Sequence, residues 1–102
     1  MSKGKVLITD DLHSLLKEGL IADGFEVDDR PNIAPEQVLA IINEYTGLVI
    51  NSKVYAGGEL LGKATKLKFV CRAGSGLEVI DLPFAAAHNI AVFNSPEGNR
   101  NA

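Results

Sequence analysis

Residues 71–81, which read Cys-Arg-Ala-Gly-Ser-Gly-Leu-Glu-Val-Ile-Asp, decide the fold because they join an apolar run to a helical segment. Residues 67–71 are mostly apolar, which predicts a short strand. Residues 82–87, Leu-Pro-Phe-Ala-Ala-Ala, predict a helix, and Asp81 is a suitable cap for it. The stretch therefore indicates a strand, a glycine-rich turn and a helix in immediate succession.

Two glycines shape the turn inside this stretch. Gly74 and Gly76 flank Ser75, so the backbone can bring bare N–H groups close to a ligand. The spacing begins like the dinucleotide fingerprint G-x-G-x-x-G, but Val79 stands where the third glycine should be. We therefore interpret the stretch as a tight strand-to-helix turn and not as a cofactor loop.

Strand and helix signals alternate along the rest of the chain. Strands are predicted at residues 6–8, 25–28, 47–50, 67–71 and 90–93, and helices at 12–20, 35–45, 60–64 and 82–87. Strict alternation of this kind predicts right-handed crossovers and a parallel sheet covered on both faces. We expect Asp10 and Asp11 to cap the first helix. Its apolar stripe is expected to comprise Leu12, Leu15, Leu16 and Leu20.

The polarity of the strands indicates their order. The run at 25–28 carries Glu26 and Asp28, which suits an edge strand. The other four runs are nearly continuous apolar segments, which is typical of central strands. The order 2-1-3-4-5 puts the polar strand outermost. The prediction is therefore an α/β, flavodoxin-like three-layer sandwich with a five-stranded parallel sheet, in one domain over residues 1–102.

Composition narrows the classes of partner and compartment. The chain has 102 residues, a net charge of −3 and a pI near 5.3, with no lysine-arginine run, which argues against nucleic acid and anionic membranes. The apolar runs are too short to span a bilayer, and no signal peptide is recognised. The single cysteine, Cys71, excludes an internal disulfide, and we expect a buried, inert thiol. These features favour a cytoplasmic protein.

A ligand site is expected beyond the carboxyl ends of the strands, near the point where the strand order reverses. Three segments should meet there, at residues 9–11, 51–53 and 74–76. The second and third offer backbone N–H groups, small polar side chains and Lys53, which together could hold an anion such as a carboxylate. The alternative is that Asn51 and Ser52 only cap the following turn.

Two blocks of sequence resemble one enzyme family. Residues 72–81, R-A-G-S-G-L-E-V-I-D, resemble the R-x-G-x-G-x-D-x-I-D signature of the D-2-hydroxyacid dehydrogenases, which include phosphoglycerate dehydrogenases. Residues 94–99, N-S-P-E-G-N, resemble the N-x-P-E-G-N block of that family, and the spacing between the blocks also matches. The resemblance implies the substrate-binding (catalytic) domain of an NAD-dependent oxidoreductase.

The resemblance also implies which residues hold the carboxylate of a 2-hydroxy or 2-keto acid. They are Asn51, Ser52, Lys53 and Val54 in the first loop, Gly74, Ser75 and Gly76 in the turn, and Asn99. The chain departs from the family pattern in places, and Gly57-Gly58 loosens the start of the third predicted helix. Glu78 replaces an aspartate, Ser75 a valine or isoleucine, and Tyr55 a threonine.

The catalytic and cofactor-binding residues of the family lie further along its chain. They are an arginine, a carboxylate and a histidine, together with the NAD fingerprint of a second domain. We therefore expect weak binding of the acid but no turnover, and neither catalytic, cofactor-binding nor metal residues within these 102 residues. The expected partners are the family's NAD-binding domain and a second copy of the chain, packed on an apolar patch. Arg72 should pair with an acid, and His88 with the last carbonyls of its helix.

Two other classes of protein share parts of this pattern. Asp10-Asp11 and the helix after them look like a response-regulator receiver, but a receiver needs an aspartate where Asn51 stands, and a lysine after the fifth strand. A ligand-free flavodoxin-like scaffold or interaction module stays open, because a fold does not determine a function.

Overall fold

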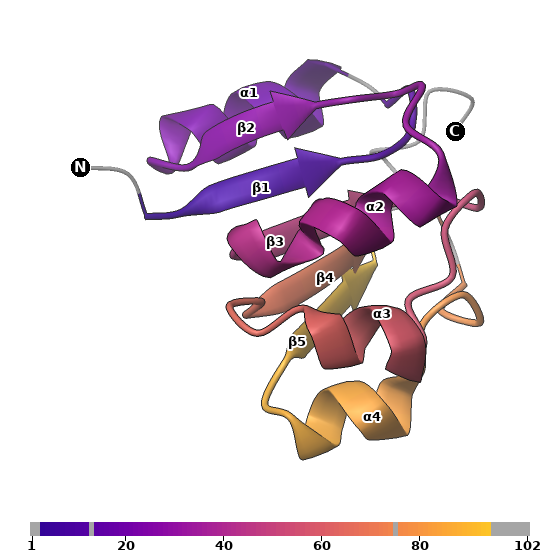
Figure 1. The fold of residues 1–102 in the computed structure, drawn as a ribbon. Coiled ribbons are helices and arrows are strands. Elements are labelled where there is room, and N and C mark those ends of the chain that lie inside the picture. Colours follow the sequence, from indigo (N-terminus) through magenta and orange to yellow (C-terminus); the bar gives the residue numbers. More distant parts are fainter. Residues whose placement is uncertain (1–2, 13, 75, 95–102) are drawn as a thin grey trace.

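The computed structural model describes residues 3–12, 14–74 and 76–94. Within these residues, strands and helices alternate as predicted (Figure 1). The strands are β1 (Lys5–Ile8), β2 (Glu26–Asp29), β3 (Gly47–Ile50), β4 (Phe69–Arg72) and β5 (Ala91–Asn94). The helices are α1 (Ser14–Ala22), α2 (Pro35–Ile41), the 3₁₀ helix η1 (Ile42–Glu44), α3 (Gly58–Lys63) and α4 (Leu82–Ala87).

The strands form one parallel sheet in the order β2-β1-β3-β4-β5, which confirms the predicted order. The register places Ile8 beside Val49, Val49 beside Cys71, and Cys71 beside Phe93. These four side chains therefore form one row across one face of the sheet.

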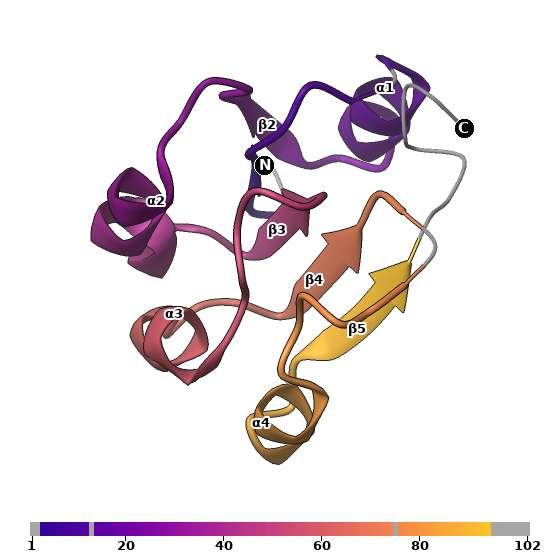
Figure 2. The ribbon, with the colours of Figure 1, turned by 90° about the vertical axis from the view of Figure 1, so that its right-hand side faces the viewer.

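Helices lie on both faces of the sheet, which confirms the three-layer architecture. Figure 2 shows α1 on one side and α2, α3 and α4 on the other. The larger core cluster lies under α2, α3 and α4 and includes Leu7, Leu48, Ile50 and Val70, all fully buried. The smaller cluster lies under α1.

The helix ends follow from local chemistry. Gly24, with φ +99°, adopts the left-handed conformation just after α1. Pro35 opens α2, as predicted. The Asp81 Oδ1 accepts a hydrogen bond from the Phe84 N–H at 3.1 Å, so Asp81 caps α4, as predicted. After α4, Asn89 takes a positive φ of 59° and turns the chain toward β5.

The start of α1 differs from the prediction. The helix begins only at Ser14, so Asp10 is too far away to cap it, and its carboxylate contacts Thr9 and Ser52 instead. Leu15 is 67% exposed and does not belong to the apolar stripe. Leu12, Leu16 and Leu20 pack against the sheet, whereas Leu15 projects about 100° to one side of Leu16 around the helix axis.

One face of the sheet is covered only in part, which differs from the expected complete cover. Along the row from β1 to β5, Ile8 and Val49 are buried, Cys71 is half-buried, and Phe93 is 56% exposed. The reason is that α1 lies over the β1 end of this face, while β5 forms the far edge of the sheet. The apolar composition of β5 therefore does not make it a buried strand, and the expected burial of Cys71 is incomplete.

In the part of the chain that the structure describes, no helix combines the length and the apolar character needed to cross a membrane.

Candidate functional site

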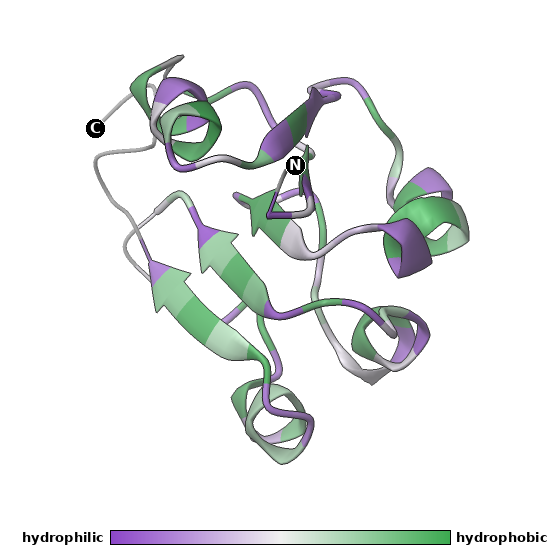
Figure 3. Ribbon diagram, turned by 90° about the vertical axis from the view of Figure 1, so that its left-hand side faces the viewer, coloured by the Kyte–Doolittle hydropathy of each residue, from purple (hydrophilic) through white to green (hydrophobic). Residues whose placement is uncertain are grey.

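Polar residues gather at the carboxyl edge of the sheet. Thr9 and Asp10 follow β1, Asn51 follows β3, Arg72 ends β4 and Asn94 ends β5. Figure 3 shows this change along β4 and β5, whose hydrophobic strands end in hydrophilic tips. Because parallel strands all end at the same edge, the loops that follow them lie side by side there.

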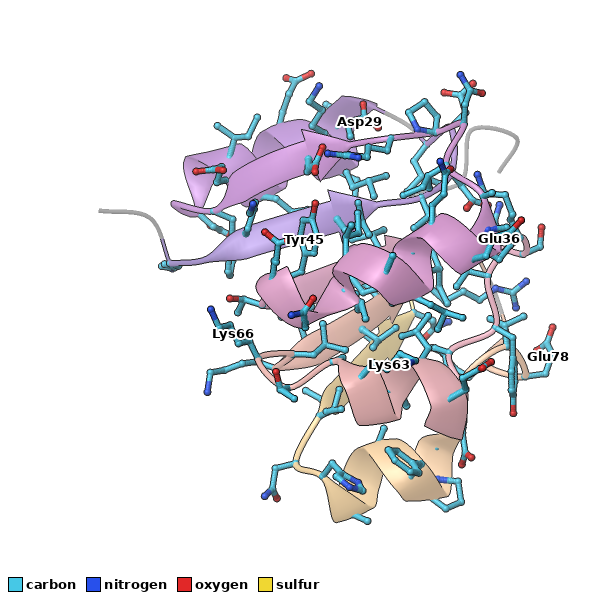
Figure 4. All side chains as sticks on the ribbon, in the orientation of Figure 1. Asp29, Glu36, Tyr45, Lys63, Lys66 and Glu78 are labelled. Atoms are coloured by element: carbon cyan, nitrogen blue, oxygen red, sulfur yellow. The ribbon has the colours of Figure 1, made fainter. Side chains whose placement is uncertain are left out.

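Arg72 joins the loop after β3 to the turn after β4. Its Nε donates a hydrogen bond to the carbonyl oxygen of Asn51 at 3.2 Å, and its Nη1 donates to the carbonyl oxygen of Gly76 at 2.8 Å. Nη1 also lies 3.0 Å from Oε1 of Glu78, which confirms that Arg72 pairs with an acid. Glu78 stands at the edge from which these loops leave the sheet (Figure 4).

The Arg72 and Glu78 side chains lie close to both glycines of the turn. A Cβ at position 74 would lie 3.0 Å from Arg72 Nε and 3.3 Å from Asn51 Oδ1. A Cβ at position 76 would lie 2.1 Å from Glu78 Oε2 and 3.1 Å from Arg72 Nη1. Glycine at both positions therefore leaves room for the Arg72 side chain between the two segments.

A second contact joins the same two segments further from the sheet. The Ala56 N–H donates to the Val79 carbonyl oxygen at 2.8 Å, and the Asp81 N–H donates to the Ala56 carbonyl oxygen at 2.9 Å. These bonds form an isolated parallel bridge between Ala56 and Ile80. The loop after β3 is thus held to the segment before α4 at both of its ends.

The residues of the first loop point in different directions. Asn51 lies beside Gly74, as the predicted site requires. The Ser52 N–H is directed at Asp10 Oδ2, 3.4 Å away. The Lys53 ammonium donates to the Pro31 carbonyl oxygen at 2.9 Å, so it extends toward the loop after β2.

Three of the predicted site residues remain, namely Val54, Ser75 and Asn99. The Val54 side chain is buried in the core, so only its backbone could face a ligand. Ser75 and Asn99 lie outside the described residues. The structure therefore brings Asn51, Ser52, Gly74 and Gly76 to one edge, and it directs the Lys53 side chain away from them.

The carboxyl edge of the sheet carries both negatively and positively charged side chains. The buried Thr9 hydroxyl donates to Asp10 Oδ1 at 2.8 Å and so holds that carboxylate beside Ser52. A hydrogen bond from its own backbone N–H, together with the Arg72 guanidinium, lowers the pKa of Glu78. The sequence placed Asp10 in one of the segments expected at the site but gave its side chain only the role of a helix cap, and it assigned Arg72 to the scaffold. Their positions at the strand ends were the available signal of a role in the site.

Neither His88 nor Cys71 is among the predicted site residues. The Nδ1 of His88 lies 3.0 Å from the Phe84 carbonyl oxygen, as expected at the end of α4, and its ring stacks on Phe84 at 4.2 Å between centroids. Burial raises the pKa of the Cys71 thiol. Among residues 3–12, 14–74 and 76–94, no group of three or more His, Cys, Asp or Glu side chains is placed to hold a metal ion.

Two similar proteins carry the same name. The chain is 35% identical over 95 residues to D-3-phosphoglycerate dehydrogenase of Sus scrofa, an alignment that covers 93% of this chain and 18% of the relative. It is 36% identical over 101 residues to D-3-phosphoglycerate dehydrogenase of Mycobacterium bovis, which covers 97% of this chain and 19% of the relative. The chain therefore spans about a fifth of the length of these relatives.

Solved structures share the fold. A protein from Pyrococcus horikoshii matches with a TM-score of 0.81 at 21% identity, over 90% of this chain and 27% of that one. The NAD⁺-bound 3-phosphoglycerate dehydrogenase of Entamoeba histolytica matches with a TM-score of 0.76 at 24% identity, over 92% of this chain and 33% of that one. At these identities the likeness concerns the fold alone.

The family model of the D-isomer specific 2-hydroxyacid dehydrogenase catalytic domain matches residues 6–102, which is nearly the whole sequence. Both signature blocks, the glycine turn after β4 and the segment that begins at Asn94, lie within this match. The chain therefore belongs to the D-isomer specific 2-hydroxyacid dehydrogenase family.

Proposed function

We propose that this chain is the substrate-binding half of an NAD-dependent D-2-hydroxyacid dehydrogenase of the phosphoglycerate type. The observation that carries the proposal is the convergence of Asn51 and Ser52 with the Gly74–Gly76 turn at the carboxyl edge of the sheet. Parallel α/β sheets bind their ligands at this edge. The names of the relatives support a three-carbon phosphorylated acid as the substrate class.

The backbone would hold the carboxylate of the 2-hydroxy or 2-keto acid. The Ser52 N–H already faces a carboxylate, that of Asp10, at 3.4 Å. Gly76 uses its carbonyl oxygen for Arg72, which leaves its N–H outside that contact. A ligand carboxylate would replace Asp10 at the Ser52 N–H and lie against the glycine turn. The chain's own part in this mechanism is to bind and orient the acid.

The same turn does not fit a dinucleotide. On the side of Gly74 and Gly76 where a Cβ would stand, the Arg72 and Glu78 side chains leave no room for a pyrophosphate. At the start of the following helix, α4, the Asp81 carboxylate accepts a hydrogen bond from the Phe84 N–H, and its negative charge would repel a pyrophosphate. We therefore propose that NAD binds to the other domain of the family, and that these 102 residues by themselves bind the acid without turnover.

Two partners belong to this proposal. One is the NAD-binding domain of the family, which would close over the carboxyl edge. The other is a second copy of the chain, packed on the incompletely covered part of the sheet at Phe93, which is 56% exposed. A cytoplasmic location is also part of the proposal, because a single cysteine fits a reducing compartment. Light scattering of the chain and of Phe93→Asp tests the second copy, since only the former should form a dimer.

The binding proposal is tested by titrating 3-phosphoglycerate into the ¹⁵N-labelled chain and following the amide resonances. Shifts are expected at Asn51, Ser52, Gly74 and Gly76. Glycerol 3-phosphate is the matched control, because it keeps the phosphate and a hydroxyl but lacks the carboxylate, and it should leave these amides unmoved. NADH should also leave them unmoved.

A well-dispersed spectrum whose amide resonances do not shift when 3-phosphoglycerate is added would contradict this binding role for the isolated chain. It would favour the ligand-free scaffold. Oxidation of 3-phosphoglycerate by the chain with NAD would contradict the absence of turnover. Equal shifts with glycerol 3-phosphate would place the recognition on the phosphate instead of the carboxylate.

A further inference from the structure

We propose that Arg72 is the positioning residue of this site, because its guanidinium group sets the separation between the loop after β3 and the Gly74–Gly76 turn. Its effect on ligand affinity rests on the proposed function, whereas its effect on the two loops does not. Arg72 acts through the backbone carbonyl groups of Asn51 and Gly76 and does not itself contact the substrate in this proposal.

The first support is the burial and the reach of the side chain. Arg72 is the last residue of β4, and its side chain is only 13% exposed. Its hydrogen bonds to the Asn51 and Gly76 carbonyl oxygens come from two different nitrogens of one rigid plane. A planar fork of this kind fixes the distance and the angle between its two acceptors, which a lysine ammonium cannot do.

The second support is the place where these bonds occur. The β3–β4 ladder ends with the Ala73 N–H donating to the Ile50 carbonyl oxygen at 2.8 Å. Within the described residues, the next backbone hydrogen bond between the two segments is that of Ala56 to Val79. Arg72 bridges the interval between these two points, and this interval contains the proposed carboxylate donors.

The third support is the glycine pair. A Cβ at position 74 would come within 3.0 Å of the Arg72 Nε, and one at position 76 would meet Glu78 Oε2 at 2.1 Å and the Arg72 Nη1 at 3.1 Å. The backbone at Gly74 and at Gly76 therefore lies close to the guanidinium. The absence of a Cβ at positions 74 and 76 therefore makes room for the Arg72 side chain, in addition to any room it makes for a ligand.

The ion pair with Glu78 is not the part that positions the loops. Glu78 is 73% exposed, and ion pairs at such positions contribute little. Glu78→Gln removes this ion pair but leaves both carbonyl contacts of Arg72 in place. Arg72→Lys does the reverse, because it keeps the positive charge and loses the fork. The two variants form a matched pair.

The experiment measures amide hydrogen exchange without ligand, and then affinity for 3-phosphoglycerate and for inorganic phosphate, in the unmodified chain, R72K and E78Q. Arg72→Gln is measured in parallel, so that a folding defect of one variant does not decide the result. In R72K we expect faster exchange in both loops and about a tenfold loss of affinity for 3-phosphoglycerate, as charge-assisted hydrogen bonds are lost. E78Q should stay within about twofold of the unmodified chain.

The ratio of the two affinities separates positioning from stability. A variant that is merely less stable loses both ligands in proportion to its folded fraction, so the ratio stays constant. Loss of positioning lowers the affinity for 3-phosphoglycerate more than that for inorganic phosphate.

Each outcome decides one of the two proposals. Unchanged loop exchange in R72K, or faster exchange with unchanged affinity, would overturn the role of Arg72. If the unmodified chain fails to bind 3-phosphoglycerate, the proposed function fails, while the exchange data without ligand still decide whether Arg72 fixes the loops.

Discussion

The hydroxyl group of Tyr45 donates a hydrogen bond to the carboxylate of Asp28, and this contact ties the edge strand β2 to the end of η1. Tyr45 is buried and lies beside β1, between the two elements it connects (Figure 4). The same carboxylate accepts hydrogen bonds from Arg30 Nε at 2.9 Å to each oxygen. A polar residue of the edge strand is thus hydrogen-bonded to a buried tyrosine of the core, in addition to the pairing of β2 with β1.

Replacing Tyr45 by Phe removes this hydrogen bond while keeping the ring in the core. We expect the free energy of unfolding to fall by about 1.5–3 kcal/mol, the usual contribution of a hydrogen bond to a charged group. Urea unfolding of the chain and of Tyr45→Phe measures the difference. Tyr55→Phe is the matched control, because Tyr55 is 61% exposed, and it should change stability by less than about 0.5 kcal/mol. Equal effects of the two substitutions would contradict this account.

Asp28 makes stability depend on pH at the acid end. Desolvation by burial acts to raise its pKa, but the hydrogen bonds from Arg30 and Tyr45 and the charges of Arg30 and Lys5 outweigh it, so the pKa is lowered from 3.8. The folded state therefore favours the carboxylate. Its contribution is present above the unfolded pKa and is lost as the pH falls from 3.8 through the lower folded value.

Asp28→Asn removes this titration. We expect the unfolding free energy of the variant to fall less steeply below about pH 4 than that of the unmodified chain, as linkage requires. Urea unfolding at a series of pH values measures both slopes. Parallel slopes would show that Asp28 does not titrate differently in the folded and unfolded states.

Two glycines should respond in opposite directions to the same substitution. A Cβ at Gly47, at the start of the central strand β3, would lie 2.2 Å from the ring of Phe69, so Gly47→Ala should destabilise the fold by about 1–3 kcal/mol. A Cβ at Gly19, inside α1, meets nothing within 4 Å, so Gly19→Ala should stabilise it by about 0.5–1 kcal/mol. Thermal unfolding of both variants checks the signs, and a gain for Gly47→Ala would refute the packing described for Phe69.

Asp10 should weaken the proposed site, because its carboxylate already faces the Ser52 N–H. Asp10→Asn is expected to raise the affinity for 3-phosphoglycerate by up to about fivefold, since exposed charge interactions are typically worth about 0.2–1 kcal/mol. Asp23→Asn removes the same charge beside Gly24, at the opposite edge of the sheet, and should leave affinity unchanged. An equal gain in both variants would indicate a general effect of net charge instead of a contact with the loop.

The fold could be predicted from the sequence because its evidence is distributed over many residues. Apolar runs separated by helical patterns determine a parallel sheet, and the charges of Glu26 and Asp28 identify the edge strand. The cap by Asp81 follows from one residue type directly before a helix. Each of these features depends on sequence neighbours, so each could be recognised without coordinates.

The site could be predicted only as a set of segments. The strand ends that meet at the carboxyl edge follow from topology, but the directions of long side chains do not. Lys53 reaches Pro31, and Arg72 reaches Asn51, because of distances across the folded chain that no local pattern encodes. Likewise, the apolar sequence of β5 says nothing about whether a helix covers it, so the exposure of Phe93 was missed.

Because the α1 face of the sheet is incompletely covered, the Cys71 thiol can serve as a probe of this face. Cys71 is half-buried in the row that ends at Phe93, and it is the single cysteine of the sequence. Its raised pKa keeps the thiolate fraction small at neutral pH, so alkylation should be slow but measurable under alkaline conditions. Whatever docks over Cys71 and Phe93 will shield the sulfur, and the labelling rate then reports occupancy of this face without any mutation.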